Sequence, residues 1–261
     1  MKCRIKIKVN VSYKGQDDMS AHQLTDLLIA NFEVFLDAFR RYCPFKKYGQ
    51  LQCHIRTIEL RRDLGSAQAA INDEKFLLTL YDTLQAWGIG ARRSKLKPFS
   101  DFAKALESKA SEIAEFENIK ISNVLDAAVT GKKLARLIHN LGVVDNKSRI
   151  VAGTKALHHL LPELVVPIDR EYTQQFFGWH NPQFQNFPQE CFVEAFENFI
   201  RISRAVDLSQ YRGEDWFSSE TKIIDNAIVG FWRWIKFDAH KIIANKGVDP
   251  NAASPSAQVT P

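Results

Sequence analysis

The sequence lacks the features that would assign it to a membrane or to a disulfide scaffold. No uninterrupted apolar run reaches the length of a transmembrane helix, and the N-terminus alternates lysine with isoleucine and valine instead of carrying an apolar signal-peptide core. We therefore expect a cytoplasmic protein without a membrane partner. The four cysteines are scattered and form no CxxC pair, which excludes a zinc knuckle and predicts reduced, buried thiols.

Metal-binding patterns, internal repeats and flexible linkers are absent as well. Neither HxxxH nor HExxH occurs, so we expect no metal site and no cofactor. Without a Gly/Ser linker, residues 1–247 are predicted to form a single compact unit of one or two lobes. Residues 248–261 are rich in proline, alanine and serine, which predicts a disordered tail.

The composition is that of an ordinary globular protein with a modest excess of positive charge. Of the 261 residues, 45% are hydrophobic and 25% are charged, which is enough to bury a sizeable core. The formal net charge is +5 and the isoelectric point is about 8.9. This balance is compatible with a polyanionic partner.

Hydrophobic periodicity predicts a mainly α protein with a small β feature near the N-terminus. The segment 4–13 alternates apolar and polar residues as a half-exposed strand does, and Ile55 and Ile58 offer the nearest strand signal for a partner. The aromatic segment 176–187 contains glycine, proline and asparagine and is predicted to be a loop. Helices are expected from His22 to before Pro44, around Phe76–Trp87, over Phe99–Phe116, from Val124 to the Gly142 stop, around Phe192–Ile200 and around Ile223–Ile235.

The segment 150–173 combines the most informative residues of the chain. Gly153 predicts a tight backbone turn, and Lys155 follows it where a short apolar helix is expected to begin. Pro162 ends that helix. Pro167 then favours an extended approach, so that Asp169 is placed to cap the next helix through the backbone of residues 172 and 173.

The triplets Gly153-Thr154-Lys155 and Pro167-Ile168-Asp169 resemble the core of the helix-hairpin-helix DNA glycosylases. This resemblance implies a two-lobed helical bundle, without an iron-sulfur cluster, that binds double-stranded DNA as a monomer. It implies that Gly153 and Thr154 belong to a hairpin whose amides hold a DNA phosphate. It also implies that Asp169 is the catalytic carboxylate and that Lys155 is the Schiff-base nucleophile of members that also cut the strand.

The chemistry of the two charged residues agrees with these roles, although each has a structural alternative. Removal of a base develops positive charge on the sugar, which the Asp169 carboxylate can stabilise, or it can activate the attacking water. The alternative is that Asp169 only caps a helix. A desolvated Lys155 can attack C1′ of the sugar, and the alternative is a solvated or phosphate-binding lysine.

Four further residues are candidates for contact with an extruded base. His158 and His159 follow Lys155 on the same predicted helix, and each could hydrogen-bond the base or lie in the core as a structural histidine. Trp179, in the aromatic loop, and Trp87, at the end of its helix, could stack on the base. For both tryptophans, an ordinary core position is the alternative.

A concentrated positive segment is predicted to face the DNA backbone. Arg92, Arg93, Lys95 and Lys97 fall within six residues, before Pro98. Contacts with phosphates would make binding strongly dependent on salt, whereas the alternative is a solvated charged face. Further basic residues assigned to the same surface are Arg40, Arg41, Lys46, Lys47, Arg61 and Arg62.

The sequence thus predicts a DNA glycosylase that flips a damaged or modified base out of the duplex and cleaves its N-glycosidic bond. The sequence does not identify the base, which is an oxidised purine, an alkylated base or a bulky base of the kind found in some phage genomes. The bulky base would imply a role in antiphage defence. A catalytically silent helical module that binds nucleic acid or protein is the second hypothesis. Val151 at the first hairpin glycine position and a shortened spacing from Lys155 to Asp169 favour it. A nuclease is a third possibility, but no metal-binding nuclease pattern supports it.

Overall fold

Helices account for nearly all the regular structure of the protein. The computed structural model describes residues 19–45, 49–90, 95–145 and 149–239. These residues contain 13 α-helices and three short 3-10 helices, and their one β-type pairing is an isolated antiparallel bridge between Leu96 and Val144. The mainly α prediction is confirmed. The predicted strand at residues 4–13 lies outside the described part.

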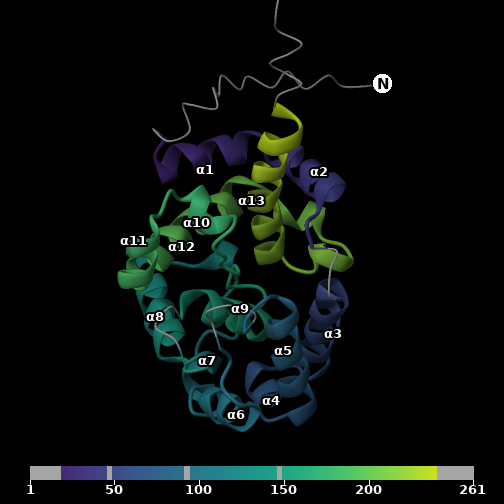
Figure 1. The fold of residues 1–261 in the computed structure, drawn as a ribbon, viewed down its shortest axis with the longest axis vertical. Helices are drawn as coiled ribbons and strands as arrows, with labels where there is room; N and C mark the ends of the chain where they lie inside the picture. Colours follow the sequence, from purple (N-terminus) through teal and green to yellow (C-terminus); the bar gives the residue numbers. More distant parts are fainter. Residues whose placement is uncertain (1–18, 46–48, 91–94, 146–148, 240–261) are drawn as a thin grey trace, which may run out of the picture.

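Two groups of helices lie one above the other (Figure 1). The upper group comprises α1 (Ala21–Ala30), α2 (Phe32–Tyr42), α10 (Thr173–Phe176), α11 (Asn181–Asn186), α12 (Pro188–Ala205) and α13 (Glu220–Phe237). Helices α3 (Gln50–Asp63), α4 (Ala67–Ile71), α5 (Glu74–Ala86), α6 (Phe99–Glu107) and α7 (Ala110–Ala114) make up the lower group. Helices α8 (Ala127–Asn140) and α9 (Ile150–Leu160) complete the body, and one buried hydrophobic core extends through both groups.

Close packing of α2 against α13 forms the centre of the upper group. Phe35 of α2 meets the ring of Phe231 edge to face, with the centroids 5.2 Å apart. Beside this contact, Gly230 brings the two backbones together: a Cβ atom at Gly230 would lie 1.9 Å from the carbonyl oxygen of Phe35. Only glycine fits at this position, because any side chain would collide with the backbone of α2.

Replacing Gly230 by alanine is expected to destabilise the protein by about 3 kcal/mol, because α2 and α13 must separate to admit the methyl group. Gly213 is the matched control, since a Cβ atom there meets nothing within 4 Å. Urea unfolding measures both effects. Equal stability of the Gly230→Ala and Gly213→Ala proteins would contradict the close packing of the two helices.

The predicted helices are present, and several are divided. The helix expected from His22 is broken at Asn31 into α1 and α2, and the one expected over 99–116 is divided at Lys109 into α6 and α7. The predicted stops at Gly88 and Gly142 are confirmed, with φ of 82° and 73° at these residues. Both angles lie in the left-handed region that favours glycine.

The strand signal at Ile55 and Ile58 was wrong, because both residues lie in α3. The buried face of this helix is polar and consists of His54, Thr57 and Arg61. Hydrophobic periodicity therefore could not reveal the helix, although the spacing of its buried residues is helical.

The prediction of an irregular loop over 176–187 was also wrong in part. Gly178 turns the chain with φ of 67°, but residues 181–186 form helix α11 with a proline in its first turn. Proline fits there because the first amides of a helix have no intrahelical acceptor. The helix expected from Val124 begins only at Ala127, and Leu125 lies before it, 99% exposed.

Every helix in the described part of the chain is too short or too polar to cross a membrane. No disulfide joins the described cysteines, of which Cys191 is buried and Cys43 and Cys53 are half-buried.

Candidate active site

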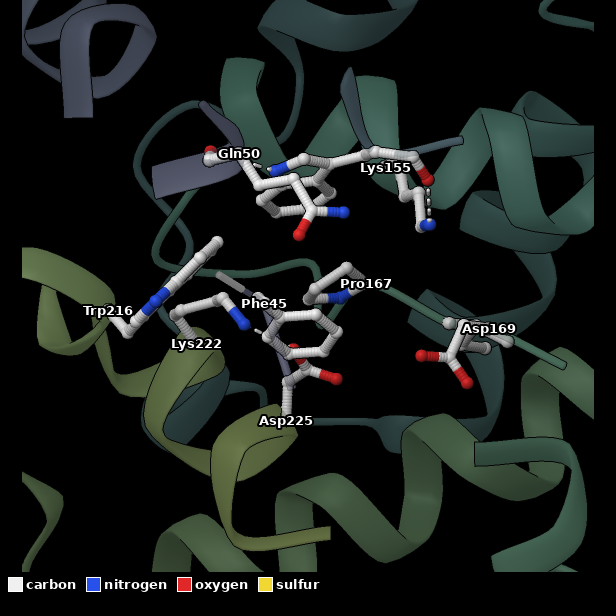
Figure 2. A pocket seen from close by; sticks show the side chains of 10 residues that line it. Phe45, Gln50, Lys155, Pro167, Asp169, Trp216, Lys222 and Asp225 are labelled. Carbon is white, nitrogen blue, oxygen red and sulfur yellow. Dashed lines mark hydrogen bonds and ion pairs between the residues drawn. The ribbon is translucent and has the colours of Figure 1, made fainter. Parts of the chain in front are cut away.

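Lys155 and Asp169 line one pocket, together with residues from both groups of helices. The pocket has an empty volume of about 360 Å³, including the part that is open to solvent. Figure 2 shows how its side chains point toward a common space. The walls also include Phe45, Gln50, Trp87, Trp216, Lys222 and Asp225, with Pro167 and Ile168 of the segment before Asp169.

Asp169 is fixed at the end of an extended segment. Its Oδ1 atom accepts hydrogen bonds from the backbone amides of Tyr172 at 2.6 Å and Thr173 at 3.2 Å, so the carboxylate caps the turn that leads into α10. The two predicted hydrogen bonds are confirmed, but they close a turn and do not cap a helix, because α10 begins only at Thr173 with Tyr172 as its N-cap. Burial raises the pKa of Asp169, and the Asp225 carboxylate adds to this, while Lys155 and the two amides act in the opposite direction.

Two side chains of α9 hold this extended segment in place. The hydroxyl of Thr154 accepts a hydrogen bond from the amide of Ile168 at 3.1 Å. The Nδ1 atom of His158 bonds to the carbonyl of Val165 at 2.9 Å. Both side chains are fully buried. Thr154 and His158 therefore position Asp169 by bonding the segment that precedes it. They do not face solvent, as the predicted contacts of Thr154 with DNA and of His158 with a base would require.

Gly153 lies inside α9 and not in a turn before it, which corrects the sequence-based prediction. The helix begins at Ile150, and a Cβ atom at Gly153 would lie 2.9 Å from Cγ2 of Ile138 and 3.1 Å from its carbonyl oxygen. The glycine thus permits a close approach of α8 and α9. A buried backbone inside a helix is also unsuited to the predicted phosphate contact.

Lys155 projects from α9 to the end of α5. Its ammonium donates a hydrogen bond to the carbonyl of Trp87 at 3.1 Å and lies 5.6 Å from the centre of the Trp87 ring. Burial lowers the pKa of Lys155; the Asp169 and Asp225 carboxylates oppose this shift, and Lys222 reinforces it. A lowered pKa increases the fraction of neutral amine, which is the nucleophilic form.

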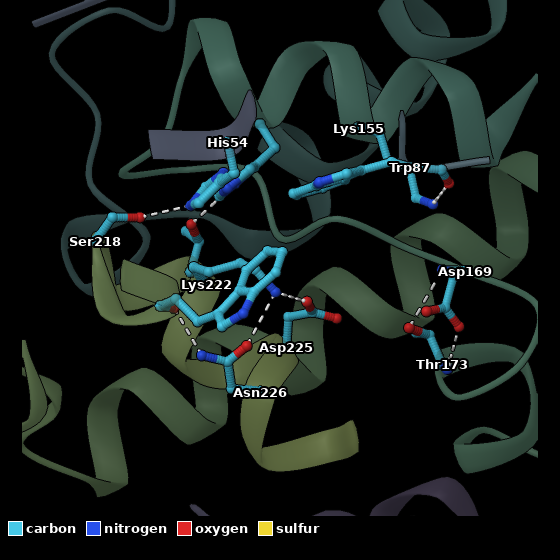
Figure 3. Close-up of polar contacts among 12 residues, drawn as sticks. His54, Trp87, Lys155, Asp169, Thr173, Ser218, Lys222, Asp225 and Asn226 are labelled. Atoms are coloured by element: carbon cyan, nitrogen blue, oxygen red, sulfur yellow. Dashed lines mark hydrogen bonds and ion pairs between the residues drawn. The ribbon is translucent and has the colours of Figure 1, made fainter. Parts of the chain in front are cut away.

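A second lysine and a second aspartate of the pocket come from α13. The ammonium of Lys222 donates to Asp225 at 2.5 Å and to Asn226 at 2.9 Å. Asn226 in turn donates to the backbone carbonyl of Trp216 at 2.7 Å, as Figure 3 shows. Lys222 is only 1% exposed, so its charge is paired in the interior of the protein.

Behind the pocket, His54 and His159 form part of a directed hydrogen-bond chain. His159 Nδ1 must donate to the carbonyl of Lys155 at 2.8 Å, because a carbonyl only accepts. His159 Nε2 then accepts from Nδ1 of His54 at 3.1 Å, and His54 Nε2 accepts from Ser218 at 2.9 Å. His159 is fully buried, so its position supports α9 and does not match the predicted contact with a base.

Acid is expected to destabilise the protein through these histidines. Burial lowers the pKa of His159 to about 4, and it lowers those of His54 and His158 well below their usual value. In the unfolded chain the histidines bind protons near pH 6.5. The stability that comes from keeping them neutral in the fold is therefore complete above that pH and is lost as the pH falls toward 4. For His159 alone, the loss is roughly 3 kcal/mol.

Urea unfolding at pH 7.5 and pH 4.5 measures this dependence. His159→Gln should reduce the difference between the two pH values, whereas His22→Gln, at an exposed histidine of α1, should leave it unchanged. An unchanged difference in the His159→Gln protein would show that the buried histidines do not cause acid sensitivity.

Trp179 lies away from the pocket, contrary to its predicted role. Its ring is stacked against Phe177 at 4.8 Å and against Phe184 at 5.7 Å between centroids, and its Nε1 atom donates to Glu194 at 2.8 Å. The turn at Gly178 directs this tryptophan inward, where it is 5% exposed. The aromatic residues that were predicted to form a loop at the site therefore include part of the hydrophobic core.

The predicted basic surface is described only in part. Arg92 and Arg93 lie outside the described residues, as do Lys46 and Lys47. Lys95 and Lys97 flank the bridge at Leu96 and do not line the pocket; Lys95 is exposed and Lys97 half-buried.

Arg61, which was assigned to the same basic surface, is a structural residue. It is 7% exposed, donates to the carbonyl of Leu160 at 2.8 Å and pairs with Glu117. This arginine therefore satisfies the C-terminal end of α9 instead of facing DNA.

The sequence did not single out the α13 contribution to the pocket. Lys222 and Asp225 are three residues apart within the apolar pattern of the last helix, a position that places charge on a buried face. That conflict between charge and burial was the available signal. Phe45 and Gln50 carried no such signal, because only the tertiary fold brings them to the pocket.

Comparison of the chain with protein-family models, curated proteins and solved structures gave no match. The function must therefore be argued from the pocket.

Proposed function

We propose that this protein is a DNA glycosylase that takes a base out of the duplex and cleaves its N-glycosidic bond. The observation that carries the proposal is that Lys155 and Asp169, matched from sequence to a lysine-aspartate pair of the helix-hairpin-helix glycosylases, line the same aromatic pocket. The proposal includes that architecture, with the pocket between two groups of helices.

Asp169 acts on the sugar in this proposal. As the bond between C1′ and the base nitrogen breaks, the bonding electrons leave with the base and positive charge develops on the sugar. The Asp169 carboxylate stabilises that charge or takes a proton from the attacking water. Its backbone hydrogen bonds hold it at the pocket, and its raised pKa makes it a better proton acceptor.

Lys155 provides a covalent route. The neutral amine attacks C1′ as the bond to the base breaks, and the base leaves with the bonding electrons. The nitrogen then loses a proton, the C1′–O4′ bond breaks as the sugar ring opens and O4′ takes a proton, and the resulting Schiff base permits cleavage of the strand. Two features support this role: burial lowers the lysine pKa, and its one described hydrogen bond is to the carbonyl of Trp87. Trp87 and Phe45 supply apolar ring faces against which an extruded base can stack.

The test is a panel of duplexes, each with one damaged or modified base, incubated with the protein and then treated with alkali to break abasic sites. Strand breaks at one or more modified bases, lost in the Asp169→Asn protein, are expected. Breaks that persist in that variant would remove Asp169 from the mechanism. Absence of breaks on every substrate, with DNA binding retained, would support a catalytically silent binding module.

A further inference from the structure

The α13 charges suggest which kind of base the pocket accepts. In Figure 2, Lys222 lies on one side of Phe45 and Lys155 and Asp169 lie on the other, with Asp225 below the ring. If the sugar is attacked at the side of Lys155 and Asp169, the far edge of its base extends toward Lys222. This inference rests on the proposed function and specifies its substrate class.

The ammonium of Lys222 lies near three aromatic rings of the pocket. Its ammonium lies 4.8 Å from the ring centre of Trp216, 5.5 Å from that of Phe45 and 5.6 Å from that of Trp87. Aromatic faces attract cations at such distances. A positively charged base would therefore compete with a lysine that the fold holds in place.

The pair formed by Lys222 and Asp225 offers hydrogen bonds to an uncharged base. An ammonium has three N–H groups, and the described acceptors, Asp225 and Asn226, take two of them. The third can donate to a carbonyl oxygen at the edge of a base. One oxygen of Asp225 bonds Lys222, and the carboxylate has further acceptor capacity for a neighbouring ring N–H.

We infer that Lys222 reads the extruded base and selects an uncharged base with a carbonyl at the edge remote from the sugar. Cationic alkylated bases are rejected. Asp225 and Asn226 hold the ammonium in position, and Asn226 also fixes Trp216 through its backbone carbonyl. Among the candidate substrates named from the sequence, selection by Lys222 favours oxidised or other carbonyl-bearing bases over cationic alkylated bases.

The test compares affinities for duplexes in which one nucleotide carries a 2′-fluoro group, which slows base loss. The probes are 8-oxoguanine, uracil and 5-hydroxymethyluracil as uncharged carbonyl bases, 7-methylguanine as the cationic base, and a tetrahydrofuran abasic analogue. The wild-type protein should bind at least one uncharged probe about 10-fold more tightly than the 7-methylguanine probe. Tighter or equal binding of 7-methylguanine would overturn the inference.

The variant Lys222→Met/Asp225→Asn removes both charges together, because loss of Lys222 alone would leave a buried carboxylate without its partner. Its preference for the uncharged probe should fall to within about 2-fold, with unchanged affinity for the abasic analogue. A retained preference would exclude Lys222 as the selecting group. If the wild-type protein does not prefer the abasic analogue to an unmodified duplex, the proposed glycosylase function fails first, and the inference fails with it.

Discussion

Base release by the Asp169→Asn protein is expected to be about 10³-fold slower than by the wild-type protein, without loss of stability. The amide has no negative charge to stabilise the sugar and cannot take a proton from water. Asparagine caps a helix as well as aspartate does, so the bonds from Tyr172 and Thr173 are retained. Since burial raises the pKa of Asp169, its ionised form is disfavoured in the fold, and a neutral amide relieves that cost.

The matched control is Asp126→Asn. Asp126 caps α8 by accepting a hydrogen bond from the amide of Val129 at 2.9 Å, and it does not line the pocket. Its replacement should leave base release unchanged. Single-turnover rates and thermal unfolding of both variants separate the roles. If the Asp169→Asn protein is destabilised enough for unfolding to account for its loss of activity, the carboxylate is only structural.

The second large effect is expected at Lys155. Borohydride added during turnover should trap a covalent adduct of the wild-type protein with DNA, and the Lys155→Met protein should form none. Methionine fits a buried, unbranched position, so the pocket is expected to remain folded. Base release by this variant should fall by about 10²-fold, because the nucleophile is lost while Asp169 stays in place.

Peptide mapping of the trapped adduct identifies which pocket lysine reacts. Attachment is expected at Lys155 and not at Lys222, since Lys222 is held by Asp225 and Asn226. Lys132→Met, at an exposed lysine of α8, serves as the control and should retain the adduct. Base release without any adduct in the wild-type protein would assign Lys155 a non-covalent role and leave the mechanism to Asp169.

The sequence predicted the helices whose buried faces are apolar. The pattern at Phe192, Phe196 and Phe199 corresponds to α12, and that at Ile223, Ala227 and Phe231 corresponds to α13. Helix α3 was missed because polar side chains occupy its buried face, where His54 bonds His159. A periodicity of apolar residues cannot detect a helix that packs through hydrogen bonds.

The site was predictable where it depends on local sequence. Lys155 and Asp169 are 14 positions apart, and the extended segment at Pro167 ends at Asp169, so that their meeting at one site could be inferred. Trp216 and Lys222 join them only through tertiary packing. The same limit explains Trp179, whose loop composition suggested exposure although its ring is enclosed by Phe177 and Phe184.

The most direct test is a crystal structure of the Asp169→Asn protein bound to a duplex that contains a substrate base from the cleavage panel. The account predicts that the base is extruded into the pocket, against Trp87 and Phe45. Its C1′ atom should then lie beside residue 169 and the Lys155 amine. A duplex bound on another face, or a base still stacked in the helix with the pocket empty, would contradict it.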